Sequence, residues 1–270
     1  MTDKSDFTPS VNINKIKEYA SQGKRFDGRG LTDYRDIEIE LGVSKKAEGS
    51  VRVRIGKTEI LAGVKMDVGT PYPDSQDKGN MIVSAELLPL SSPRIELGRP
   101  GFDAIELGRL VDRGLRESGF IDFKELCIKE GEKVWNLYVD VYSINDDGNL
   151  LDAAVLGAII ALKTAKMPKY DEETEKVLFG EWTENPIPLT DAVPITVCVY
   201  KVGNSLIVDP TREEEDAAEV RVSIGRTDET ISSIQKSGPQ GISSEDFGKM
   251  LEISKEVRGK IFKNIEKYLK

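Results

Sequence analysis

The sequence LYVDVYSINDDGNLLDAAVLGAIIAL, residues 137–162, decides the fold. Its first part, 137–144, is an apolar stretch with the alternation of a strand. A polar turn follows at 145–149, and residues 150–162 are apolar nearly all round, which is typical of a helix enclosed in the core. Strand-turn-helix junctions of this kind often hold an anion, because free backbone N–H groups point outward at a helix N-terminus.

The charges at this junction are unfavourable for an anion. Asp146, Asp147 and Asp152 surround the predicted helix start, and the sequence has no Lys, Arg, Ser or Thr between Asn145 and Leu162. We expect a bound phosphate to face Asp147 and Asp152 without compensation, at a cost of several kcal/mol in a partly buried site. The junction is therefore either a disabled active site or was never one.

Composition excludes several mechanisms. The chain of 270 residues is long enough for one large domain or two fused halves. It has no histidine, which excludes Ser-His-Asp and Cys-His catalysis and the usual zinc sites. A formal net charge of −9 argues against non-specific coating of nucleic acid, so RNA binding would need a local basic patch.

The cysteines and the hydropathy pattern indicate where the protein works. Cys127 and Cys198 lie in apolar runs, and we interpret them as buried, reduced thiols. The longest apolar run, 153–162, is too short to span a bilayer, and the polar N-terminus does not resemble a signal peptide. We expect a cytoplasmic protein with no membrane partner.

The periodicity of the chain predicts an α+β fold. Predicted strands are 37–41, 50–56, 58–68, 81–89, 123–129, 134–144, 195–202, 205–210, 219–225 and 230–235. Predicted helices are 11–22, 103–118 with Asp103 as N-cap, 150–165, and a last helix capped by Ser243 or Ser244. A polar crossover at 167–188 separates two halves. We divide the compact unit into an N-terminal extension with a short helix (1–24), a first half (25–185) and a second half (186–270).

Arginines are concentrated around the helix predicted at 103–118. The five are Arg94 and Arg99 in the preceding loop and Arg109, Arg113 and Arg116 on one helix face. They indicate either a solvated face, with Arg116 paired to Asp112, or an arginine ladder for a phosphodiester backbone. A second basic stretch, with Arg25 and Arg29, is either a surface loop or a contact to phosphate or a partner.

The other unusual stretch is the acidic run 213–216. We interpret it as a solvated loop, although Asp209 with Glu215 could hold Mg²⁺ or act as acid and base. Arg221 cannot exchange a proton near neutral pH, so it cannot supply the second half of a carboxylate pair.

Several motifs, kept in order along nearly the whole chain, resemble the RNase PH family of phosphorolytic 3′→5′ exoribonucleases. They are GKRFDGRG (23–30), IEIELG (37–42), GSVRVRIGKTEILAGV (49–64), ELGRLVDRGLRES (106–118), the stretch 137–162 and EEEDAAEVRV (213–222). The resemblance implies an RNase PH-like fold of two βαβα-type halves with mixed sheets and central helices, similar to domain 2 of ribosomal protein S5.

The resemblance also implies what this chain lacks. Active members of the family bind phosphate through a Gly-Ser/Thr-Arg turn, which corresponds here to Asn149-Leu150-Leu151. Two Asp residues six apart in active members correspond to Glu215 and Arg221. The resemblance therefore implies no catalytic residue, no cofactor and no metal, with Leu150, Leu151, Glu215 and Arg221 as degenerate positions.

The helical extension before Arg25 and the loop SSPRIELGRPG (91–101) look like the non-catalytic RNase PH-like subunit of archaeal exosome cores. That resemblance implies a hexameric ring, a trimer of heterodimers with a catalytic RNase PH-like subunit, threaded by single-stranded RNA. Cap subunits with OB-fold and KH or zinc-ribbon domains would sit on it. The five arginines would lie near the RNA channel, and we favour Arg109 and Arg113 as contacts. The alternatives are a self-sufficient phosphate-dependent exoribonuclease and a purely structural ring spacer.

Overall fold

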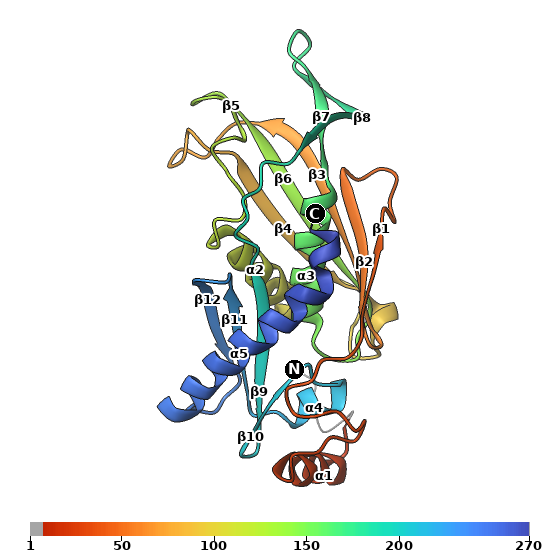
Figure 1. The fold of residues 1–270 in the computed structure, drawn as a ribbon. Coiled ribbons are helices and arrows are strands. Elements are labelled where there is room, and N and C mark those ends of the chain that lie inside the picture. Colours follow the sequence, from red (N-terminus) through yellow and green to blue (C-terminus); the bar gives the residue numbers. More distant parts are fainter. Residues whose placement is uncertain (1–7, 270) are drawn as a thin grey trace.

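Figure 1 shows a computed structural model of the chain, which describes residues 8–269. Part of the predicted N-terminal extension, residues 1–7, lies outside this range. The helices of the described residues are α1 (Ser10–Ser21), α2 (Phe102–Arg116), α3 (Leu150–Thr164), α4 (Arg212–Ala217) and α5 (Ser244–Ile265), with short 3₁₀ helices η2 (Pro89–Ser91) and η3 (Glu266–Tyr268). None of these helices is long and apolar enough to cross a lipid bilayer.

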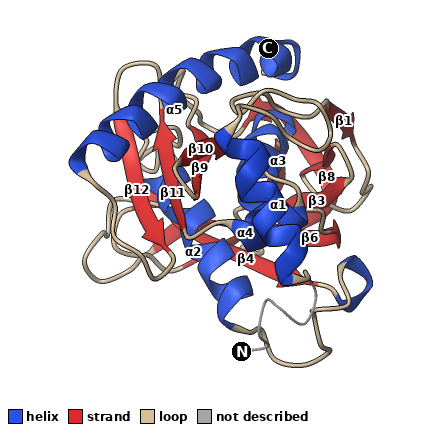
Figure 2. Cartoon of the chain, turned by 90° about the horizontal axis from the view of Figure 1, so that it is seen from below, coloured by secondary structure: helices blue, strands red, loops and turns tan. Residues whose placement is uncertain are grey.

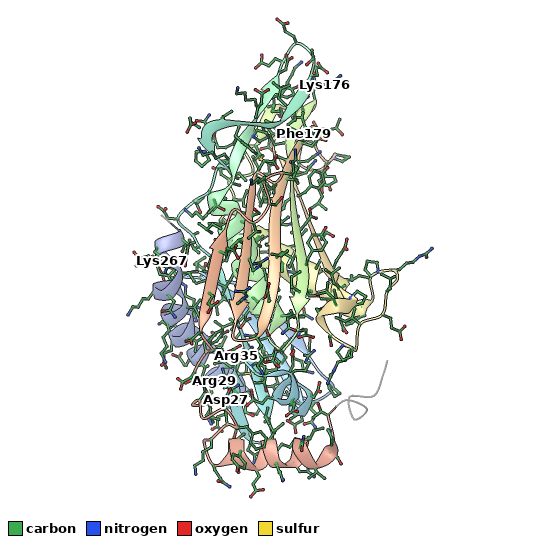
Figure 3. The ribbon with its side chains drawn as sticks, turned by 90° about the vertical axis from the view of Figure 1, so that its right-hand side faces the viewer. Asp27, Arg29, Arg35, Lys176, Phe179 and Lys267 are labelled. Carbon is green, nitrogen blue, oxygen red and sulfur yellow. The ribbon has the colours of Figure 1, made fainter. Side chains whose placement is uncertain are left out.

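The first sheet is mixed. Its strands, in spatial order, are β1 (Ile37–Leu41), β2 (Gly49–Ile55), β3 (Thr58–Gly69), β6 (Lys133–Asn145) and β4 (Asn80–Leu87), and β5 (Cys127–Lys129) also pairs with β6. All pairs are antiparallel except β4 with β6, because the chain crosses through α2 between these two strands. Helices α2 and α3 pack on one face of the sheet, and the opposite face is turned to the viewer in Figure 3.

The second sheet is antiparallel, in the order β10 (Ser205–Val208), β9 (Ile195–Val202), β11 (Val220–Arg226) and β12 (Ile231–Ser237). Helix α5 packs against β9 and β11, as the view in Figure 2 shows. Helix α3 contacts β2 and β3 of the first sheet and β9 of the second, so it lies between the sheets. This explains why every residue from 151 to 162 is buried, as the all-apolar pattern predicts.

A close approach fixes α3 against the first sheet. A Cβ added at Gly157 would lie 2.5 Å from the Cδ1 of Ile60, so only glycine fits there without movement of the buried Ile60 side chain. Ile60 of β3 and the α3 residues that face it are fully buried. Burial of each such aliphatic side chain contributes roughly 1.5–3 kcal/mol to the free energy of unfolding. Helix α3, whose N-terminus borders the site described below, is therefore held in place by packing against both sheets.

The predicted α+β class is confirmed, and most element bounds agree within two residues. The crossover 167–188 is more regular than predicted, since it forms the hairpin β7 (Lys166–Asp171) and β8 (Lys176–Pro186), which projects at one end of the molecule in Figure 1. The strand predicted at 123–129 is confined to its last three residues. The division into 1–24, 25–185 and 186–270 stays a prediction.

Two helix starts differ from prediction. Helix α2 begins at Phe102 after Gly101, so Asp103 stands in the first turn and is not the N-cap. The acidic run is not a solvated loop, because it forms α4, which begins with a capping box in which Thr211 and Glu214 exchange hydrogen bonds. The last helix is capped as predicted by Ser243, whose hydroxyl accepts from the Asp246 N–H at 3.0 Å.

Candidate functional site

A cavity of about 480 Å³ lies beside the N-terminus of α3, where α2, α4 and β11 also meet. Leu150 and Leu151, the first residues of α3, form part of its apolar wall. Its charged lining comprises three arginines and five acids: Arg94, Arg212, Arg221, Asp103, Glu106, Asp146, Glu215 and Asp216. Acids thus outnumber arginines, which disfavours the binding of an anion.

Each of these arginines is paired with a carboxylate of the chain. The pairs are Arg94–Asp216 (2.7 and 2.5 Å), Arg221–Glu106 (2.9 Å) and Arg212–Asp146 (2.9 Å), and Arg212 also contacts Glu215. Paired guanidinium groups in a partly buried wall have little charge to offer a further anion. The positive charges that a phosphate would need are therefore already neutralised.

The prediction that Asp147 and Asp152 face a bound anion without compensation is wrong. The Asp152 side chain is buried in the core, where it accepts hydrogen bonds from the Tyr34 hydroxyl and the Cys198 N–H. Asp147 lies 3.4 Å from the Arg35 guanidinium. Neither carboxylate lines the cavity, so the obstacle to anion binding lies elsewhere.

The carboxylate of Glu215 takes the place of an anion at the start of α3. It accepts from the backbone N–H of Asn149, the N-cap residue, at 3.3 Å and from the Tyr200 hydroxyl at 3.1 Å. Burial acts to raise the pKa of Glu215, but the charges of Arg212 and Arg221 and these hydrogen bonds outweigh it and lower the pKa overall. Glu215 is therefore charged at neutral pH and competes directly with phosphate.

Arg221 stands at the second predicted acid position and cannot act as an acid. Its guanidinium donates to Glu106 at 2.9 Å and to Ser237 at 3.1 Å. Burial acts to lower the pKa of Arg221, but the neighbouring Tyr200 and Cys198 raise it, and the net change is upward. The side chain stays protonated and serves as a structural cation between α2 and the second sheet.

The alternative pair of Asp209 and Glu215 does not form a metal site. Asp209 is fully buried and accepts hydrogen bonds from Arg29 at 2.9 Å, Arg35 at 2.7 Å and Asn149 at 2.9 Å. Figure 3 shows Arg29 and Arg35 together at the end of the first sheet. Within residues 8–269, no group of three or more His, Cys, Asp and Glu side chains is arranged to hold a metal ion.

The basic stretch at 23–30 was predicted to be either a surface loop or a contact to phosphate or a partner. Neither prediction is correct for Arg25. This side chain is buried and ion-paired with Glu214 of α4, and it donates to the carbonyls of Val208 at 2.9 Å and Asp209 at 2.8 Å. Arg29 likewise points to Asp209 and to Asp27. The arginines of this stretch therefore connect the N-terminal segment to residues 208–214 through internal ion pairs and hydrogen bonds.

The arginines of α2 divide into two kinds. Arg109 and Arg113 are exposed, and neither pairs with a carboxylate of the part of the chain that the structure describes. Arg116 pairs with Asp112 at 2.6 Å, as the spacing predicts, and donates to the Met81 carbonyl at 3.0 Å. The two exposed arginines border a hollow between α2 and β4 and remain available for a ligand.

The two loop arginines are not alike. Arg94 reaches into the cavity beside α3 and pairs with Asp216, so the structure does not bring it together with Arg109 and Arg113. Arg99 is exposed on the loop before α2. The predicted basic patch is therefore reduced to the exposed helix arginines and Arg99.

Sequence reasoning missed three residues that pair with the charged side chains in and around the cavity. Arg35 binds Asp209 with two guanidinium nitrogens, Arg212 neutralises Asp146, and Glu106 holds Arg221. One signal was present, because Arg212 directly precedes the acidic run and buried acids require nearby cations. The other two pairings join distant parts of the chain and carry no local signature.

Comparisons with known proteins agree with this geometry. Residues 33–168 match the model of the 3′ exoribonuclease family, domain 1, and residues 192–257 match that of domain 2. The chain is 40% identical to "Exosome complex component Rrp42" of Methanothermobacter thermautotrophicus over 269 residues, 99% of this chain and 98% of the relative. It is 43% identical to the protein of the same name from Thermococcus onnurineus over 264 residues, 95% of this chain and 96% of the relative.

Among solved structures, the chain is similar to one in "archaeoglobus fulgidus exosome with RNA bound to the active site", with a TM-score of 0.85 and 40% identity. That match covers 94% of this chain and 98% of the other. A chain of "Archaeal exosome core" aligns with a TM-score of 0.83 and 37% identity, covering 95% and 96%. The two structural matches thus extend over 94–95% of this chain.

Proposed function

The chain belongs to the RNase PH family of 3′ exoribonucleases, and we propose that it is a non-catalytic, RNA-contacting subunit of an archaeal exosome ring. The relatives that cover its length are named exosome components, and the solved structures it resembles are archaeal exosome cores. Its part in the exosome follows from these relatives. The non-catalytic role and the RNA contacts are our proposal.

The occupation of the anion position by Glu215 carries the non-catalytic proposal. Phosphorolysis needs a phosphate beside the RNA end, and this cavity has a half-buried carboxylate at the helix start, with all three of its arginines paired. Leu150 and Leu151 add no donor from their side chains. Phosphate would have to displace Glu215 from its ion pair with Arg212, and this separation is unfavourable because both side chains are partly buried, at 17% and 27% exposed.

The RNA-binding proposal rests on Arg109 and Arg113. Both are exposed, and they stand one turn apart on α2, where two guanidinium groups can follow a phosphodiester backbone. Exposed Tyr72 and Ile105 border the same hollow and offer surfaces for bases. Arg94 and Arg116, which we also predicted to bind RNA, are engaged by Asp216 and Asp112 and contribute less.

The proposed partner is a catalytic RNase PH-like subunit, arranged with this chain as a trimer of heterodimers in the cytoplasm, with RNA-binding cap subunits above. A ring reassembled from the two purified chains tests the role of this one. Mass measurement should give a hexamer, and single-stranded RNA binding should weaken at least tenfold with Arg109→Glu plus Arg113→Glu. The slope of the logarithm of the binding constant against the logarithm of the salt concentration should also decrease, by the amount expected for about two phosphate contacts.

The matched control reverses two exposed lysines of α5, Lys249→Glu plus Lys260→Glu, and so makes the same change in net charge. RNA affinity should be unchanged by the control. Equal RNA affinity of the ring with and without the α2 changes would instead assign this chain the role of a structural spacer.

A further inference from the structure

Two arginines are buried side by side at the junction of α5 with the second sheet. Arg226 is the last residue of β11 and is 8% exposed, and Arg258 lies on α5 and is 5% exposed. This junction is distinct from the cavity beside α3. Arg221, which lines that cavity, stands five residues earlier on β11, about 16 Å away at 3.3 Å per residue.

Apart from a close contact of Arg258 with the exposed Asp228, the hydrogen bonds of both guanidinium groups are long and incomplete. Arg226 donates to the Leu251 carbonyl at 3.4 Å and to the Ser254 hydroxyl at 3.5 Å, and Arg258 donates to the Val193 carbonyl at 3.4 Å. The buried Nε of each arginine has no acceptor among residues 8–269. Because a guanidinium has five N–H donors and burial removes water from them, this arrangement leaves strong donors unmet.

The positive charge at the junction is also poorly neutralised. Arg258 contacts Asp228, but the Asp228 side chain is 76% exposed and mostly in water. Burial, first, and the charge of Arg226 lower the pKa of Arg258. The Phe262 ring lies 4.7 Å from the Arg258 guanidinium and covers it from one side without offering a hydrogen-bond acceptor in its plane.

We propose that Arg226 and Arg258 form a binding site for a small tetrahedral oxyanion, with inorganic phosphate or sulfate as its simplest ligands. The oxyanion would accept from the unmet Nε donors and neutralise both guanidinium groups, as bidentate arginine–oxyanion pairs do. Asp228 is the internal competitor: its exposed carboxylate holds Arg258 in this structure and swings into water when the anion binds. The site is independent of the role in the exosome.

Thermal unfolding of the whole chain against phosphate or sulfate, at constant ionic strength set with sodium chloride, tests the site. Both anions should give saturable stabilisation. At one hundred times the Kd, the folded-to-unfolded ratio should rise about 100-fold. Titration calorimetry should give one anion per chain. Stabilisation that is absent, or that rises without saturation, would overturn the proposal.

Three variants locate the site. Arg226→Met and Arg258→Met should abolish the saturable stabilisation, while Arg221→Met, which alters the other cavity, should leave it unchanged. Loss of the effect in Arg221→Met alone would assign the anion to the cavity beside α3 and refute the inference. Should the methionine variants not fold, Asp228→Asn removes only the exposed competitor and should lower the Kd for phosphate at least threefold. An unchanged Kd in Asp228→Asn also contradicts the proposal.

Discussion

Comparison of the native chain with an Asp152→Asn variant measures how the charge of Asp152, in the first turn of α3, affects the free energy of unfolding. The Asp152 carboxyl is fully buried, and burial raises its pKa to about 6 from 3.8, although hydrogen bonds from Tyr34 and Cys198 act to lower it. Between pH 4 and 6 the folded chain therefore binds a proton that the unfolded chain has released. The free energy of unfolding falls as the pH rises through this window, by about 3 kcal/mol for a difference of about 2 pH units.

The asparagine variant keeps the size of the side chain and an acceptor for the Tyr34 hydroxyl, but it does not titrate. Both proteins are unfolded in urea at pH values between 4 and 7. The free energy of unfolding of the native chain minus that of the variant should fall by about 3 kcal/mol as the pH rises. Tyr34→Phe should extend the fall to higher pH, because the lost hydrogen bond no longer lowers the pKa of Asp152. A stability difference that stays constant across this pH range would refute the assignment of a buried, ionisable Asp152.

Three further changes test the site. Arg25→Met leaves Glu214 as a buried, unpaired charge and should lower the free energy of unfolding by about 3–5 kcal/mol in urea unfolding. Gly148→Ala should destabilise by more than 1 kcal/mol by the same measurement, because φ is +83° and the new Cβ would meet the Pro210 carbonyl at 2.6 Å. Leu150→Ser with Leu151→Arg should not produce phosphorolysis of oligo(A), since neither change removes the carboxylate at the helix start; nucleoside diphosphate release by this variant would contradict that reasoning.

The fold was largely predictable because its signals are local. The strand 37–41 and the strand 195–202 are found with the predicted bounds, since alternation of apolar residues depends only on neighbours. The buried α3 followed from a run of apolar residues with no polar face. Asp103 was misassigned as the cap because the N-cap of α2 is Gly101, two residues earlier. Bounds of this kind depend on the loop that precedes the helix.

The site was less predictable because its ion pairs join distant parts of the chain. The sequence marked Arg221 and the leucines at the α3 start as unsuited to phosphate chemistry, and the lining of the cavity agrees. It misplaced the obstacle to anion binding, because nothing local shows that Asp152 turns into the core. Arg25 pairs with Glu214 across 189 residues of sequence. Such pairings are fixed by tertiary packing, which periodicity does not encode.

The measurement that tests the central claim most directly is phosphorolysis by the purified chain without a partner. Incubated with oligo(A) and inorganic phosphate, it should release no nucleoside diphosphate, whereas the ring reassembled with the catalytic subunit should release it steadily. Release by this chain alone, at a rate like that of the ring, would contradict the account and identify a self-sufficient exoribonuclease that uses Asp209, Glu215 or Asp216.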